Sequence, residues 1–125
     1  MTLTHAPMIS IIDDDESVRR ATESLVRSLG FVAFTFESAE DFLRSPQVEV
    51  TSCLISDIQM PGMTGIELQD YLTAHDYRIP IIFITAFPEE RIRKRAQDAG
   101  AVGFFSKPFD GLALIKSLDG ALNPD

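Results

Sequence analysis

The sequence lacks the features that several classes of protein require. Its 125 residues include a single cysteine, Cys53, so no internal disulfide can form. No apolar run approaches the roughly 20 residues of a membrane-spanning helix, and no basic segment followed by an apolar stretch indicates a signal peptide. The net charge of −8 argues against nucleic-acid binding by the domain itself, because phosphate contacts need a basic face. We therefore expect a cytoplasmic domain that binds neither membrane nor nucleic acid.

Several kinds of ligand site are also missing from the sequence. Neither the nucleotide-phosphate loop GxxxxGK(S/T) nor the dinucleotide fingerprint GxGxxG occurs. The two histidines, His5 and His75, lie away from the ends of the expected strands, and we expect both to be exposed to solvent. Any site must therefore be built mainly from carboxylates, hydroxyls and amines.

Short apolar runs alternate with helical patterns along the whole chain. Strands are expected at 8–12, 32–36, 52–56, from Pro80 to 84, and at 102–106. Helices are expected over 16–29, after Ser38, after Thr64, from Pro88 to about 99, and after Asp110 as far as Leu122. In the first helix, we expect Val18, Ala21, Thr22, Leu25 and Leu29 to share the core-facing side.

Strands that alternate with helices predict parallel βαβ units, and nearly continuous apolar strands predict a sheet covered on both faces. The fold class is therefore α/β: a flavodoxin-like, doubly wound (βα)5 domain with its five-stranded parallel sheet in the order 2-1-3-4-5. We expect a single domain over residues 1–125, with its core at about 8–122. Residues 1–7 would be an N-terminal tail, and 123–125 a tail or the start of a linker.

Polar groups follow four of the expected strands where each one ends. Asp57 follows the run 52–56, Thr85 follows 81–84, and Lys107 follows 102–106. The triplet Asp13-Asp14-Asp15 follows the first strand. Ligands bind at the carboxyl ends of strands in open α/β sheets. The pattern therefore predicts a site for a divalent cation and a phosphoryl group.

Carboxylate oxygens suit Mg²⁺, which needs only one or two of them from a protein. Asp14 and Asp57 could bind the ion directly, and Asp13 directly or through water, whereas Asp15 is expected to cap the following helix. Asp57 could also act as a nucleophile that forms an aspartyl phosphate, with Thr85 and Lys107 contacting the phosphoryl oxygens. The plainer alternatives are a helix-capping role for Thr85 and a solvated surface role for Lys107.

The segments IIDDDES, SDIQMPGMTGIEL, FITAF and GFFSKPF resemble the receiver domain of bacterial two-component response regulators. SAEDFL and DAGAVGFFSKPF are most similar to receivers of the FixJ type. The resemblance implies that Asp57 accepts a phosphoryl group from the phosphohistidine of a sensor histidine kinase. It also implies that Asp13, Asp14 and the backbone carbonyl of Gln59 bind Mg²⁺, that Lys107 contacts the phosphoryl group, and that the Lys107-Pro108 peptide is cis.

The resemblance further implies a conformational switch. Thr85 would move inward upon phosphorylation, and Phe104, where many receivers have tyrosine, would fill the vacated space. The surface of the last two helices and the last strand would then change and control an output, which we expect to be transcription. The sequence leaves open whether the receiver stands alone or acts on a C-terminal DNA-binding domain absent from this chain, and the FixJ-type likeness favours the second. A phosphorylation-dependent homodimer is also compatible with the resemblance. The only chemistry expected of the domain is its own phosphoryl transfer and slow self-dephosphorylation, so it would not be an enzyme.

Two competing functions remain at the level of sequence. A phosphate-independent protein-interaction module could keep the same fold without switching, although the complete set of acids, Thr85 and Lys107 argues against it. An Mg²⁺-dependent phosphohydrolase with an aspartyl nucleophile would need a second acid just after Asp57 and a substrate cap. Ile58 and Gln59 supply no such acid.

Overall fold

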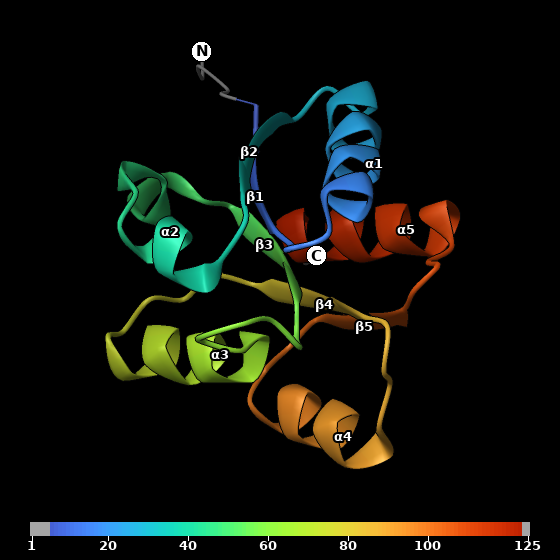
Figure 1. Cartoon of the computed structure of the whole chain (residues 1–125). Coiled ribbons are helices and arrows are strands. Elements are labelled where there is room, and N and C mark those ends of the chain that lie inside the picture. The colour runs from blue at the N-terminus through green and yellow to red at the C-terminus, as the bar shows by residue number, and fades with distance from the viewer. Residues whose placement is uncertain (1–5, 124–125) are drawn as a thin grey trace.

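The computed structural model describes residues 6–123 as a parallel sheet with helices on both faces (Figure 1). The sheet order is β2-β1-β3-β4-β5, and every neighbouring pair of strands is parallel. The predicted flavodoxin-like fold and strand order are therefore confirmed. The strands are β1 (Met8–Ile12), β2 (Val32–Phe36), β3 (Cys53–Asp57), β4 (Ile81–Thr85) and β5 (Gly103–Ser106). The helices are α1 (Glu16–Ser28), α2 (Ala39–Leu43), η1 (Pro46–Val50, a 3-10 helix), α3 (Gly65–Ala74), α4 (Glu90–Asp98) and α5 (Gly111–Leu122).

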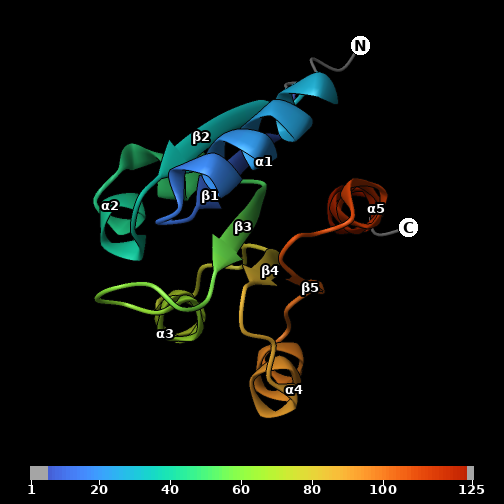
Figure 2. The same ribbon diagram turned by 45° about the vertical axis from the view of Figure 1, so that its right-hand side comes forward.

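The helices divide between the two faces of the sheet, as the two views show (Figures 1 and 2). On one face, Val26 of α1 and Leu114 of α5 pack with Ile9 and Ile55 of the strands in one buried cluster that also holds Cys53. On the other face, α2, α3 and α4 pack over a second buried cluster. Both faces are covered, and this is why the strands read as nearly continuous apolar runs.

Side-chain caps fix where four of the helices begin. At α2, Ser38 accepts from the backbone N–H of Asp41 at 3.1 Å. Asp15 accepts hydrogen bonds from two backbone N–H groups in the first turn of α1, as predicted. Thr64 and Glu67 form the reciprocal capping box at the start of α3, with distances of 3.1 and 2.9 Å. Asp110 accepts from a backbone N–H of α5 at 3.0 Å. Each cap satisfies donors that a helix start would otherwise leave unpaired, so the loops before these helices are held in place.

The structure differs from the sequence prediction in a few local features. Ala21 is exposed, whereas Val26, which the prediction left out, is fully buried. Thr22 and Val26 lie four residues apart and define the buried stripe, so Ala21 falls to one side of it. Between α2 and β3, where no helix or strand was predicted, the chain forms η1, which buries Val48. Predicted element bounds are off by one residue at β3, at β4, at the start of β5 and at the end of α1, and α4 begins two residues later than predicted.

Two further observations complete the description of residues 6–123. His75 is exposed, as predicted, and its ring stacks on Tyr71, while His5 lies outside the described residues. None of the helices in this part of the chain combines the length and apolar content that crossing a membrane requires.

Candidate functional site

The carboxyl ends of β1, β3, β4 and β5 meet at one edge of the sheet and bring the predicted polar groups together. The register pairs Asp57 with Ile84, the neighbour of Thr85. Asp13 follows the end of β1, which lies beside β3. Carboxylate oxygens of Asp13, Asp14 and Asp57 all lie within 4.8 Å of one another. Strand order and register thus assemble an acidic cluster from residues that are far apart in the sequence.

Lys107 reaches into this cluster from the loop after β5. Its Nζ lies 3.0 Å from Asp13 Oδ2 and 3.2 Å from Asp57 Oδ2. The side chain of Lys107 is only 14% exposed, so it is not the solvated surface lysine of the plainer alternative. Its backbone N–H donates to the carbonyl of Thr85 at 2.8 Å, and the Lys107-Pro108 peptide is cis, as the resemblance implied.

Burial sets the protonation equilibria of this cluster. Burial, and then the negative charge of Asp13, raises the pKa of Asp57 from 3.8 to about 6, although Lys107 partly opposes the rise. Burial likewise raises the pKa of Asp13, against the opposing effects of a backbone N–H and of Lys107. For Lys107, burial acts to lower the pKa, but the two carboxylates outweigh it and leave the pKa raised. At neutral pH, the cluster therefore holds charges that a low-dielectric environment disfavours.

The cluster fits a small divalent cation that prefers oxygen ligands. Three carboxylates lie together and one ammonium pairs with two of them, Asp13 and Asp57, so the charge is only partly balanced within the protein. Asp13 and Asp57 are buried whereas Asp14 is exposed, which leaves one side of the group open to solvent. A hydrated Mg²⁺ suits such an arrangement, because it keeps several water ligands and takes few from the protein. The backbone carbonyl of Gln59 as a further ligand stays a prediction.

Thr85 is fully buried at the end of β4, and its hydroxyl has two partners. Its Oγ1 donates to Gln59 Oε1 at 2.5 Å and accepts from the backbone N–H of Phe87 at 3.1 Å. Phe104, the predicted switch aromatic, is half-buried and packs against the cluster beneath α3 and α4. Its movement stays a prediction. The side-chain contact of Gln59 was not predicted, since the sequence pointed only to its backbone.

Two contacts that support the site were also missed. Arg19 of α1 donates through Nη1 to the backbone carbonyl of Asp13 at 2.8 Å and so holds the loop after β1. Glu40 of α2 accepts from the backbone N–H of Met63 at 2.9 Å, which lowers the pKa of Glu40. Gly62, at φ +77°, leaves room for this carboxylate, since a Cβ there would overlap Glu40 Oε2. No local sequence pattern indicates either contact, because each joins separate elements.

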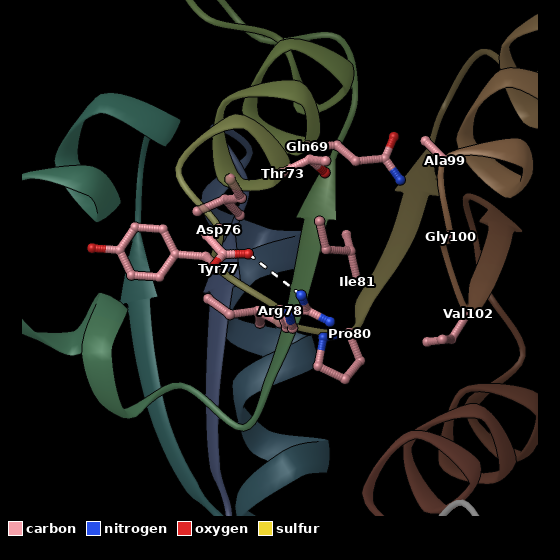
Figure 3. Close-up of a pocket in the computed structure, with 12 residues that line it drawn as sticks. Gln69, Thr73, Asp76, Tyr77, Arg78, Pro80, Ile81, Ala99, Gly100 and Val102 are labelled. Atoms are coloured by element: carbon pink, nitrogen blue, oxygen red, sulfur yellow. Dashed lines mark ion pairs between the residues drawn. The ribbon is translucent and has the colours of Figure 1, made fainter.

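A cavity of about 460 Å³ lies elsewhere, beside the amino end of β4 between α3 and the loop that follows α4 (Figure 3). Its lining includes Gln69, Pro80 and Val102, together with an exposed ion pair between Asp76 and Arg78 at 3.6 Å. Gln69 is buried, and its Nε2 donates to a backbone carbonyl of α4, while its Oε1 has no partner among the described residues. The charged groups of its lining, Asp76 and Arg78, are exposed and pair with each other, so the acidic edge is the better candidate for chemistry.

The comparisons with known proteins agree with this geometry. The family model of the response regulator receiver domain matches residues 9–119, and the chain therefore belongs to the receiver domain family of response regulators. It is 38% identical over 118 residues to nodulation protein W of Bradyrhizobium diazoefficiens, covering 94% of this chain and 52% of that protein. It is 41% identical over 117 residues to the response regulator protein TodT of Pseudomonas putida, with coverages of 94% and 52%.

Solved structures give the same assignment. The response regulator StyR superimposes with a TM-score of 0.88 at 43% identity, over 96% of this chain and 61% of that one. The N-terminal part of FixJ superimposes with a TM-score of 0.83 at 31% identity, over 95% of each chain. The chain spans about half the length of the two curated relatives named above.

Proposed function

We propose that this domain is a phosphorylation-driven switch of a two-component phosphorelay, with Asp57 as the phosphoacceptor. The observation that supports it most directly is the buried Asp57 carboxylate, which lies 3.2 Å from Lys107 and beside Asp13 and Asp14 in a chain of the receiver family. The proposal is supported by the closeness of a buried carboxylate, an ammonium and further carboxylate oxygens that suit Mg²⁺.

The proposed reaction moves a phosphoryl group from a phosphohistidine of a sensor kinase to Asp57. An Asp57 carboxylate oxygen attacks phosphorus, a P–O bond forms, and the P–N bond to the imidazole breaks. The imidazole leaves with the electron pair and takes a proton from solvent. Mg²⁺ bound by the three aspartates would supply positive charge opposite the phosphoryl oxygens. Lys107, already between Asp13 and Asp57, is positioned to pair with one of those oxygens.

The proposed consequence is a change on the surface formed by α4, β5 and α5. The Thr85 hydroxyl would donate to the phosphoryl group, and Phe104 would follow into the space left behind. A partner reads the change only if it binds the two states with different affinities. To shift the ratio of the two conformational states from 1:99 to 99:1, the partner must bind one state more tightly than the other by about 5.5 kcal/mol.

The output we propose is transcription. Two of the relatives, TdiR of Thauera aromatica and FixJ of Bradyrhizobium diazoefficiens, are named as transcriptional regulatory proteins, and the chain spans 52% and 56% of them. We propose that this receiver acts in the cytoplasm, controls a DNA-binding domain and forms a homodimer when phosphorylated. Beyond its own phosphorylation and slow dephosphorylation, it would turn over no substrate.

The test is intact mass spectrometry after incubation with acetyl phosphate, with and without Mg²⁺. We expect wild type to gain one phosphoryl group only when Mg²⁺ is present, and Asp57→Asn to gain none. Asp76→Asn is the matched control, because Asp76 is an exposed aspartate near the amino end of β4, away from Asp57. Phosphorylation of Asp57→Asn to the same stoichiometry would refute the site. A folded wild type that accepts no phosphoryl group from acetyl phosphate or from a kinase would favour the phosphate-independent module.

A further inference from the structure

The hydrogen bond between Thr85 and Gln59 occupies the one proton that the proposed switch needs. A threonine hydroxyl carries a single O–H donor. In the structure, this donor is directed to Gln59 Oε1 at 2.5 Å, and the hydrogen bonds of the described residues include no other acceptor for it. Thr85 therefore cannot donate to a phosphoryl group on Asp57 while its contact with Gln59 persists.

We propose that the Gln59 side chain is a positioning residue that holds the Thr85 hydroxyl in the unphosphorylated protein and competes with the phosphoryl group for it. The inference rests on the proposed function of Asp57. It assigns to Gln59 a second role, separate from the backbone carbonyl that the resemblance places near Mg²⁺. The side-chain amide thereby sets how readily the domain switches.

The local structure holds Gln59 in the position that this role requires. Gln59 lies two residues after Asp57, between the residues Ile58 and Met60, which are 3% and 7% exposed. The carbonyl of Ile58 accepts from the backbone N–H at the start of α3 at 2.9 Å. Because both neighbours are anchored, the backbone at Gln59 is fixed and its side chain can reach the end of the adjacent strand β4.

The strength of this contact is modest, which suits a reversible switch. Gln59 is exposed, so water can satisfy its amide once Thr85 leaves. A phosphoryl oxygen is a charged acceptor and attracts the hydroxyl more strongly than a neutral amide does. A neutral hydrogen bond of this kind changes an equilibrium by about 3- to 10-fold. Gln59 would therefore raise the threshold for switching without preventing it.

The decisive experiment is a double-mutant cycle. It measures the acetyl phosphate concentration at which half of the protein is phosphorylated at steady state in Mg²⁺. Gln59→Met has nearly the same shape but no strong acceptor, and we expect it to lower this concentration about 3- to 10-fold. In a Thr85→Ala background, where the hydroxyl is gone, Gln59→Met should have no effect. Gln97→Met, at an exposed glutamine in α4, is the matched control and should not change the wild-type value.

A second measurement follows the contact without any phosphorylation. The backbone N–H of Phe87 donates to Thr85 Oγ1 at 3.1 Å, and an oxygen that itself donates a hydrogen bond is a stronger acceptor. We expect the amide proton of Phe87 to shift upfield in the NMR spectrum of unphosphorylated Gln59→Met, and to stay in place in Gln97→Met.

The outcomes separate the two proposals. An equal effect of Gln59→Met in both backgrounds would show a role that does not pass through the Thr85 hydroxyl and would overturn the inference. So would phosphorylation of Gln59→Met that matches wild type, or an unshifted Phe87 amide. If wild type itself accepts no phosphoryl group, the proposed function fails, and the competition fails with it.

Discussion

The buried charge of Asp57 makes a prediction about stability that does not depend on phosphorylation. Asp57→Asn keeps the shape of the side chain and an oxygen for the Ile58 N–H, which now donates to Asp57 Oδ1 at 2.7 Å. The substitution removes the negative charge of Asp57, which is disfavoured by burial and by the negative charge of Asp13. We expect the variant to be more stable than wild type at neutral pH when no Mg²⁺ is present.

The pKa of Asp57 determines both the sign and the size of the effect. Its folded-state pKa of about 6 lies above the ordinary value of 3.8, so between these values the folded state binds more protons than the unfolded state. The contribution of Asp57 to the free energy of unfolding of wild type is therefore fully present below about pH 4 and is lost as pH rises through about 6. A change of one in pKa corresponds to about 1.4 kcal/mol, so the rise corresponds to about 3 kcal/mol at most. The lost pairing with Lys107 makes the measured gain smaller.

The assay is urea denaturation followed by far-ultraviolet circular dichroism at several pH values from 4 to 8, because the chain has no tryptophan to serve as a fluorescence probe. The stability difference between Asp57→Asn and wild type should grow with pH and level off above about 6. Added Mg²⁺ should narrow it by stabilising wild type. Asp76→Asn, at an exposed aspartate, should show no such growth. A difference that is constant with pH, or largest at pH 4, would refute the reasoning.

Three further predictions concern other positions. Gly65→Ala should destabilise the fold by about 1–3 kcal/mol, since a Cβ there would overlap the carbonyl oxygen of Asp57. Gly120→Ala, where nothing lies within 4 Å of the added Cβ, is the control in urea denaturation, and equal effects of the two variants would contradict the clash. Gln69→Leu should change the free energy of unfolding by less than about 1 kcal/mol, because the variant loses the hydrogen bond from Nε2 but also removes the unpartnered Oε1. A loss above about 2 kcal/mol in the same assay would show that the two effects do not offset each other. Phe87, close to Thr85 in the sequence, is 66% exposed. Phe87→Glu should speed loss of the phosphoryl group, because a carboxylate there would admit and orient water. Equal decay rates of phosphorylated wild type and variant, followed by intact mass, would contradict this.

Sequence reasoning could predict the meeting of Asp13, Asp57 and Lys107. Each follows an apolar run, and parallel strands present their carboxyl ends at the same edge of a sheet. The order of the strands follows from the alternation of strands and helices, which restricts the connections that a chain can make. The helix cap at Asp15 depends only on neighbouring residues, so it too could be predicted from the sequence.

Contacts between side chains of separate elements could not be predicted in this way. The bond from Thr85 to Gln59 depends on the path of a loop whose neighbours Ile58 and Met60 are buried. Gln69 was not expected in the interior because a hydrophobic pattern counts glutamine as polar, yet a carbonyl of α4 accepts its amide. These features arise from packing in three dimensions rather than from periodicity.

The helix α4 has only Ala96 as a buried residue, whereas α3 buries five. Its other ties to α3 are the bond from Gln69 and an exposed ion pair between Asp70 and Arg95. Segments with little buried apolar surface open at a lower free energy than the global unfolding of the domain. Backbone amides of α4 should therefore exchange with deuterium sooner than those of α3. We therefore expect the helix proposed to signal to open locally while the sheet and the other helices stay folded.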